Sequence, residues 1–327
     1  MNKMVRWGIL ATGGIARTFA ADLKLLPDAK IIAVGSRTRE SADRFADDFG
    51  IPLRFGSYEE LATCPEVDAI YVATPHPFHK QNTLLCLNAG KAVLCEKPFA
   101  INAREAQVMV DIARSKKVFL MEAMWVRFTP LFQKVKEWLE DGLIGDIRYL
   151  QSDYGFLSDK GPKSRVFNLK LGGGALLDVG VYPVSLASYV FNKQPDVIKT
   201  CGYLGATGVD EQSSIIFEYD GSKTASIFSA NTLETKKESI IFGTRGSIHI
   251  YGPWWQLQNV RVKIDGGDTI EEFPLQGKGY THQAIEVMNC LRDGKLESGI
   301  MPLRETVAIM KTLDHIRAQW GLKYPME

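Results

Sequence analysis

The chain has 327 residues, of which 45% are hydrophobic and 24% are charged. This is ordinary for a globular protein but long for a single core, so we expect two domains. The formal net charge of +1 excludes the positive field that would attract nucleic acid or an anionic membrane. No apolar stretch approaches the roughly 20 residues that a membrane-spanning helix needs. Five scattered cysteines without a CxxC pair predict free, mostly buried thiols and a cytoplasmic protein.

Residues 1–123 alternate between strand-type and helix-type segments. The strand candidates are mainly apolar runs, as in strands that are covered on both faces. They occur in "MVRWGIL", "AKIIAVGS", "VDAIYVATP", "KAVLCEKP" and "VFLMEA", with helices expected at 15–26, 39–50 and 102–117. This pattern predicts an α/β fold: a doubly wound parallel sheet, that is, a dinucleotide-binding Rossmann domain. Such sheets bind ligands beyond the carboxyl ends of their strands.

The first strand ends in a turn rich in small residues, "LATGGIAR". Such a turn lets the backbone approach a pyrophosphate, and the next helix offers its N-terminal amides to the anion. The predicted cofactor contacts here are Ala11, Thr12, Gly13, Gly14 and Ile15. Ala11 stands where the first glycine of GxGxxG would be, so the match is imperfect. A tight turn without a ligand is the alternative.

The second strand ends in "AVGSRTRE". A fold that prefers NAD places an acid here to hold the ribose 2′-hydroxyl. Instead, the chain has Ser36, Arg37, Thr38 and Arg39, and a guanidinium with a nearby hydroxyl suits a 2′-phosphate. We therefore predict NADP, with Ser36, Arg37 and Arg39 in contact with it and NAD as the second choice. Solvated arginines that open a helix are the alternative.

The strand candidates "VDAIYVATP" and "KAVLCEKP" lead into "VATPHPFH" and "LCEKPFA". Thr74, Pro75 and His79 are predicted to lie near the cofactor. The two histidines of the first motif have no third ligand nearby, so we expect no metal. Glu96 and Lys97 lie at the end of the second of these strands, and the proline after them restrains the lysine backbone. This directs Lys97 toward the expected nicotinamide.

Residues 124–327 read as an α+β domain for substrate binding and oligomerisation. Strands with alternating polarity predict an open, mostly antiparallel sheet, whose free face suits a homodimer. Helices are expected at 172–190, 281–293 and 302–320. In the first of these, Asp178 and Tyr182 are four residues apart and therefore share a face. The glycines of "GGGALLDVG" before them allow a close backbone approach or an unusual turn.

The glycine turn, "TPHPFH" and "CEKP" at successive strand ends resemble the glucose–fructose oxidoreductase/inositol dehydrogenase (Gfo/Idh/MocA) family over essentially the whole chain. The resemblance implies NAD(P)-dependent oxidoreductase activity, with Trp125 and Arg127 bordering the nicotinamide. A core tryptophan and a surface arginine are the alternative. Many members have a histidine where this chain has Tyr182. The tyrosine resembles the branch of dimeric dihydrodiol dehydrogenase and NADP-dependent D-xylose dehydrogenase.

The predicted catalytic residues are Lys97, Tyr182 and Asp178. A free phenol has a pKa of ~10, and an ammonium at ~4 Å could bring it to ~7. Tyr182 would then act as the general acid/base. Lys97 would lower the pKa of Tyr182 and bind the substrate oxygen, while Asp178 would orient the substrate or Lys97.

Aromatic residues are expected around the substrate, where their apolar faces stack on rings. The predicted contacts, besides Asp178 and Tyr182, are Trp125, Phe156, Trp254 and Tyr280, with Trp255 nearby in the sequence. The predicted reaction is hydride transfer between NADP and an aldose of the D-xylose or glucose type, or a cyclic trans-diol. Two alternatives stay open: an NAD-dependent glycosidase without net redox change, and a non-catalytic NADP-binding sensor.

Overall fold

The computed structural model describes residues 3–256 and 258–327, which form two compact units. The first unit contains residues up to Ala100 together with Arg104–Thr129 and Gln276–Val307. The second contains Ile101–Ala103, Pro130–Leu275 and Ala308–Glu327.

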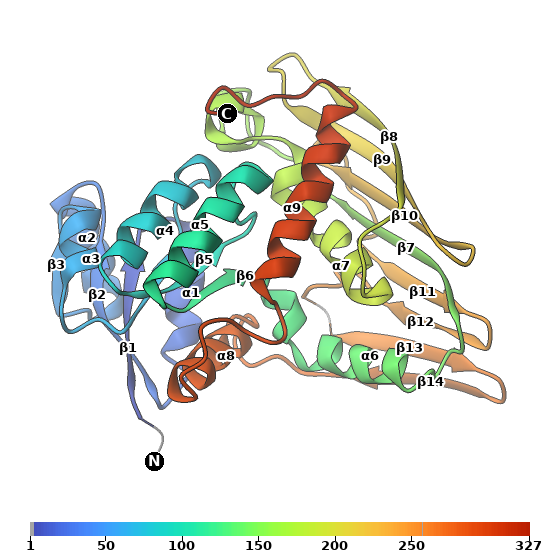
Figure 1. Cartoon of the computed structure of the whole chain (residues 1–327), viewed down its shortest axis with the longest axis horizontal. Coiled ribbons are helices and arrows are strands. Elements are labelled where there is room, and N and C mark those ends of the chain that lie inside the picture. The colour runs from blue at the N-terminus through green and yellow to red at the C-terminus, as the bar shows by residue number, and fades with distance from the viewer. Residues whose placement is uncertain (1–2, 257) are drawn as a thin grey trace. The chain divides into compact units, whose positions relative to one another are not determined.

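The first unit is built on a six-stranded parallel sheet in the order β3-β2-β1-β4-β5-β6 (Figure 1). Its strands are β1 (Val5–Leu10), β2 (Ala29–Gly35), β3 (Leu53–Phe55), β4 (Ala69–Val72), β5 (Ala92–Glu96) and β6 (Leu120–Ala123). Its helices are α1 (Gly14–Leu23), α2 (Arg39–Phe49), α3 (Tyr58–Thr63), α4 (His79–Asn88), α5 (Ala103–Lys116) and α8 (Thr281–Arg292). β4, β5 and β6 are buried at every position, which explains why their sequences are apolar except for the buried Glu96 and Glu122. The predicted Rossmann sheet is confirmed.

Helix α8 lies far along the chain but belongs to the first unit. The carboxylate of Asp22, in α1, accepts the backbone N–H groups of Lys278 and Tyr280 just before α8. This grouping differs from the sequence-based boundary between residues 123 and 124, because a return of the chain to the first sheet leaves no mark in local composition.

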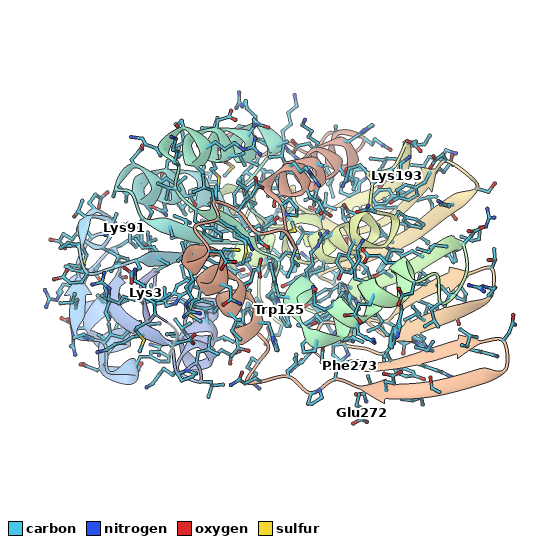
Figure 2. The ribbon with its side chains drawn as sticks, turned by 60° about the horizontal axis from the view of Figure 1, so that its bottom comes forward. Lys3, Lys91, Trp125, Lys193, Glu272 and Phe273 are labelled. Atoms are coloured by element: carbon cyan, nitrogen blue, oxygen red, sulfur yellow. The ribbon has the colours of Figure 1, made fainter. Side chains whose placement is uncertain are left out.

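The second unit contains an eight-stranded sheet in the order β14-β13-β12-β11-β7-β10-β9-β8. Among the described residues of this sheet, β7 and β10 are the only pair in parallel, so the predicted mostly antiparallel sheet is confirmed. Its strands are β7 (Ile147–Gly155), β8 (Val197–Leu204), β9 (Asp210–Tyr219), β10 (Lys223–Ala230), β11 (Ser239–Gly243), β12 (Gly246–Ile250), β13 (Asn259–Ile264) and β14 (Gly267–Glu272). The end of β14 is marked by Glu272 and Phe273 in Figure 2.

Helices α6 (Pro130–Glu140) and α7 (Val181–Phe191) lie on one face of this sheet, whereas α9 (Leu303–Ala318) begins in the first unit and ends in the second (Figure 1). Alternation along β9 separates the two faces, because Ile215 and Phe217 are buried whereas Ile216 is exposed. The helix face thus forms the core of this unit, and the other face stays open.

The segment Leu169–Phe191 is long and apolar enough, with a mean hydropathy of 1.4, to meet the criteria for a membrane-crossing helix. The expectation that no stretch approaches this length was therefore wrong. Of its 18 most apolar consecutive residues, 89% are buried inside the protein. Its apolar composition is therefore that of a core helix. The five cysteines are free thiols, four of them buried and Cys201 exposed, as predicted.

Candidate active site

The turn after β1 has the geometry of an anion-binding loop. Ala11 has a φ of 86°, so its backbone adopts the left-handed conformation that glycine takes more easily. Gly13 precedes α1, and no side chain caps this end of the helix. A Cβ atom on Gly13 or Gly14 would meet no described atom within 4 Å, and neither residue has a positive φ. Nothing in the described fold requires glycine here, so the open space fits a phosphate group on the helix N-terminus.

The residues after β2 divide into structural and available groups. Ser36 is buried, with its Oγ 3.5 Å from Thr12 Oγ1. Thr38 caps α2 by accepting the N–H of Ser41. Arg39 donates to Asp43 at 2.9 Å. Arg37 is exposed and forms no ion pair within residues 3–256 and 258–327, which leaves it as the guanidinium that can meet a 2′-phosphate.

His79 ties the ends of β4 and β5 together. It is fully buried, with Nε2 2.7 Å from the carbonyl oxygen of Thr74 and Nδ1 2.8 Å from that of Pro98. Burial lowers the pKa of His79 to about 4, so the ring is neutral at physiological pH. A neutral ring donates its single N–H to one of these two carbonyls, and its other nitrogen only lies close to the second. His79 thus links the strand ends that carry Thr74 and Lys97, and its contact with the cofactor stays a prediction.

Glu96 holds the backbone of Lys97 in place. It is buried and accepts hydrogen bonds from the hydroxyl of Tyr71 and from the backbone N–H of Lys97, the latter at 3.2 Å. Burial raises the pKa of Glu96, and the Lys97 ammonium opposes that shift. The ring of Tyr71 stacks on Phe19 of α1 at 3.9 Å between ring centroids. The backbone of the half-buried Lys97 is therefore held by Glu96, which is itself fixed by packing and hydrogen bonds.

After β6, the residues Trp125 and Arg127 have different surroundings. Arg127 is 2% exposed and donates to Glu305 at 2.7 Å, so it is not a surface residue, and its place beside the nicotinamide stays a prediction. Trp125 stacks on Tyr280 with ring centroids 4.8 Å apart, and Figure 2 shows it beside α8. The two predicted aromatic contacts of the first unit are therefore brought together.

In the second unit, Asp178 and Tyr182 lie at the start of the buried core helix. Asp178 belongs to a π-helical turn, Leu176–Gly180, and Tyr182 to the first turn of α7. Such turns inside helices are frequent at functional sites. The buried carboxylate of Asp210 accepts the backbone N–H of Leu176 at 2.6 Å and caps this end. Burial raises the pKa of Asp210 to about 7.

Arg165 forms an ion pair with Asp178. Its Nη2 lies 3.1 Å from both carboxylate oxygens of Asp178. The segment that carries Arg165 docks on the glycine run, where the N–H of Gly174 donates to the carbonyl of Val166 at 2.9 Å. A Cβ on Gly173 would lie 2.6 Å from the carbonyl oxygen of Arg165. The expected close approach of backbone at "GGG" is therefore confirmed.

The ring of Tyr182 lies among other aromatic rings. Its centroid is 5.6 Å from Tyr154 and 6.3 Å from Trp255, and those two rings stack at 3.6 Å. Trp254 is fully buried, lies edge-on to Tyr182 and donates to the carbonyl of Asp153. It therefore supports Tyr182, whereas the half-buried Trp255 and Tyr154 have surface left for a ligand. Phe156 is half-buried just after β7.

Each unit thus assembles its own group of the predicted residues. Lys97 belongs to the first unit and Tyr182 to the second, and their cooperation stays a prediction. Sequence reasoning missed Arg165 and Tyr154. Arg165 carries no motif, although its position a few residues before the glycine run was a usable signal. Tyr154 lies in a strand that reads as ordinary alternation. Among the described residues, no group of three His, Cys, Asp or Glu side chains could hold a metal ion.

Comparison with known proteins identifies the family. Residues 5–124 match the model described as "Oxidoreductase family, NAD-binding Rossmann fold", and residues 132–249 match the GFO/IDH/MocA C-terminal domain. The chain is 39% identical to a trans-1,2-dihydrobenzene-1,2-diol dehydrogenase of Xenopus laevis over 329 residues, covering 98% of this chain and 99% of the relative. It is 37% identical to the Homo sapiens enzyme of that name over 336 residues, covering 99% of each.

Solved structures have the same fold. The aldose-aldose oxidoreductase of Caulobacter crescentus, complexed with glycerol, superposes with a TM-score of 0.89 at 23% identity over 98% of both chains. A 3-ketoreductase of Actinomadura kijaniata, in complex with NADP and TDP-benzene, gives a TM-score of 0.85 at 22% identity over 97% of this chain and 98% of that one. The chain therefore belongs to the GFO/IDH/MocA family and is an NAD(P)-dependent dehydrogenase with a nicotinamide cofactor on its Rossmann domain.

Proposed function

We propose that the protein is an NADP-dependent dehydrogenase that oxidises a carbinol carbon of a cyclic trans-diol, with aldoses of the D-xylose or glucose type as the second substrate class. The observation that carries this proposal is the group of Tyr182, Tyr154 and Trp255, which joins a hydroxyl to a stacked aromatic surface. Aromatic faces stack well on flat or ring-shaped substrates. The full-length similarity to dehydrogenases named for a cyclic trans-diol supports the same choice.

The bound nicotinamide would supply the hydride acceptor in oxidation and the donor in reduction. Removal of hydride from a carbinol carbon also requires that its oxygen lose a proton. We assign this proton transfer to the Tyr182 hydroxyl. Lys97 would lower the pKa of that phenol and bind the substrate oxygen, and Glu96 and His79 would hold the Lys97 loop in place. Asp178 would orient the substrate.

The choice of NADP over NAD is part of this proposal. Arg37 is exposed and has no carboxylate partner among the described residues, whereas the neighbouring Arg39 is paired with Asp43. No acid follows β2 in the position that would hold a ribose 2′-hydroxyl. This arrangement favours a 2′-phosphate.

A homodimer through the open face of the second sheet is also proposed. Its apolar side chains include Ile216 and Phe242, which are 40% and 37% exposed, and Phe242 stacks on Tyr149 of the adjacent strand. Exposed apolar side chains gathered on one face mark an interaction surface. We further propose a cytoplasmic location, since the five cysteines are free thiols.

The test is reduction of NADP⁺ by the purified full-length protein over a panel of cyclic trans-diols, cyclic monoalcohols and aldoses, with NAD⁺ in parallel. We expect turnover with trans-diols and a preference for NADP⁺. Glycoside cleavage without net formation of NADPH would instead establish the glycosidase alternative. Binding of NADP without turnover of any polyol would establish the sensor.

A further inference from the structure

We propose that Arg165 is a positioning residue of the reaction, which holds Asp178 as an oriented carboxylate that accepts a hydrogen bond from the second hydroxyl of a neutral vicinal diol. This inference rests on the proposed function. It assigns a part in substrate recognition to a segment, residues 161–171, that no sequence motif marks.

The first argument is the geometry of the ion pair. Nη2 of Arg165 lies 3.1 Å from each oxygen of Asp178, and the carboxylate is largely buried. A buried carboxylate needs a compensating charge to remain ionised. The guanidinium supplies that charge and also limits the orientations that the carboxylate can take.

The backbone of the glycine run holds the segment that carries Arg165. Gly173 N–H donates to the carbonyl of Asn168 at 3.0 Å, and Gly174 N–H donates to that of Val166. The absence of a Cβ at Gly173 permits this contact, as a methyl group would lie within 2.8 Å of three backbone atoms. The hydroxyl of Tyr324 anchors the same glycine by donating to its carbonyl at 3.0 Å. The glycine run therefore serves to seat the segment that reaches Asp178.

One donor of the Arg165 guanidinium is left over in this arrangement. Nη1 is buried and has no hydrogen-bond partner among the described residues, whereas Nη2 contacts Asp178. A buried donor without a partner does not stabilise a fold, so the contact of Arg165 with Asp178 is made through Nη2 alone.

The last argument is the charge balance around Asp178. The groups that interact with it electrostatically include Arg165, the buried Asp210 and the phenols of Tyr154 and Tyr324. Arg165 adds the positive charge that pairs with Asp178. The Arg165–Asp178 pair as a whole is neutral, which suits an uncharged diol.

The experiment compares Arg165→Met, Arg165→Lys, Asp178→Asn and the double variant Arg165→Met/Asp178→Asn. Lys163→Met, an exposed position in the same segment, is the matched control. Turnover of a cyclic trans-diol that the wild-type enzyme oxidises is measured from about pH 5 to about pH 9, together with thermal unfolding.

For Arg165→Met we expect KM to rise about tenfold or more and the acidic limb of the kcat/KM profile to move to higher pH. Without its counter-charge, Asp178 should take up a proton more readily. Arg165→Lys should keep the acidic limb near its wild-type position while KM rises, because the charge remains and the planar fork is lost. The double variant should be no worse than Asp178→Asn alone, since the two residues act as a unit.

Three results would overturn the inference while leaving the proposed function intact. One is a wild-type pH profile and KM in Arg165→Met. Another is multiplicative losses in the double variant. The third is a lower unfolding temperature with no change in the acidic limb, which would reduce Arg165 to a structural role. If Arg165→Met does not fold, Arg165→Lys provides the test. A raised KM with an unshifted acidic limb in Arg165→Lys supports the inference, and an unchanged KM overturns it. A wild-type protein that oxidises no diol would overturn the proposed function itself.

Discussion

In the first unit, two residues that were predicted to contact the cofactor also contact the backbone of neighbouring strand ends. The polar atoms of His79 and Glu96 lie against the backbone of Thr74, Lys97 and Pro98, and their contact with the cofactor stays a prediction. A motif records that a residue belongs to a strand end, but not whether its side chain faces the ligand or the loop that carries it. The residues after β2 lead to a more specific prediction. Of the two arginines in that turn, Arg39 is paired with Asp43 and Arg37 has no carboxylate partner among the described residues.

Arg37→Asp should weaken NADP binding about 10- to 100-fold and leave NAD binding nearly unchanged, since a charge-assisted hydrogen bond contributes about 1.5–3 kcal/mol. Fluorescence titration of both cofactors measures this. Arg44→Asp, an exposed charge change on α2, is the control and should affect neither. Equal losses for NADP and NAD in Arg37→Asp would remove the 2′-phosphate assignment.

Glu122 predicts a pH dependence of stability. It is buried on β6, and burial raises its pKa from 4.5 to about 7. Between those values the folded protein keeps a proton that the unfolded chain loses, so stability falls as pH rises and then levels off above about pH 7. Glu122→Gln removes this loss and should be about 2–3 kcal/mol more stable than wild type near pH 8, with little difference near pH 4.

Urea unfolding of both proteins near pH 5 and near pH 8 tests the point, with the exposed Glu59→Gln as control. The difference in the free energy of unfolding between wild type and Glu122→Gln should increase with pH. A gap of the same size at both pH values would show that Glu122 is not the titrating group.

Among the structural elements, most strands and several helices could be predicted, because buried parallel strands and amphipathic helices each impose a periodicity on the sequence. Strands β3 and β14 and helices α3, α4 and α6 were not predicted. Residues of β14 are almost all exposed, so that edge strand has no apolar pattern to read. The π-helical turn Leu176–Gly180 and the docked segment with Arg165 depend on tertiary contacts and leave no periodic signal.

The two glycine clusters should respond differently to the same substitution. A methyl group on Gly14 meets no described atom within 4 Å, whereas on Gly173 it lies 2.6–2.8 Å from three backbone atoms. Gly14→Ala should therefore leave stability unchanged or raise it slightly, but weaken NADP binding at least about tenfold. Gly173→Ala should lower stability by about 1–3 kcal/mol.

Thermal unfolding combined with NADPH titration separates these effects, and each variant serves as the control for the other. Unimpaired NADP binding by Gly14→Ala would mean that the turn after β1 is only a tight turn. An unchanged unfolding temperature for Gly173→Ala would contradict the close packing of the Arg165 segment on the glycine run.

At the scale of the whole molecule, the open sheet face predicts self-association. Phe242→Asp should convert a wild-type dimer into a monomer, because a carboxylate would be buried in an apolar interface. Light scattering coupled to gel filtration measures the mass. Val108→Asp, at an exposed apolar position of α5, is the control. A wild-type monomer, or a Phe242→Asp dimer, would refute the assignment of this face.

The proposed reaction requires one residue of each unit, Lys97 in the first and Tyr182 in the second, to act on the same substrate oxygen. Sequence reasoning identified both from motifs, since each follows a recognisable element. It also anticipated the aromatic neighbours of Tyr182 in part, naming Trp254 and Trp255 but not Tyr154.

The most direct test of the central claim is the turnover of Tyr182→Phe with NADP⁺ and a substrate that the wild-type enzyme oxidises, measured beside the affinity of both proteins for NADPH. Removal of the phenolic proton carrier should lower kcat by ~10²- to ~10⁴-fold and leave NADPH binding within about a factor of two. A Tyr182→Phe enzyme that works within a factor of about two of the wild type would contradict the assignment of Tyr182 as the general acid/base.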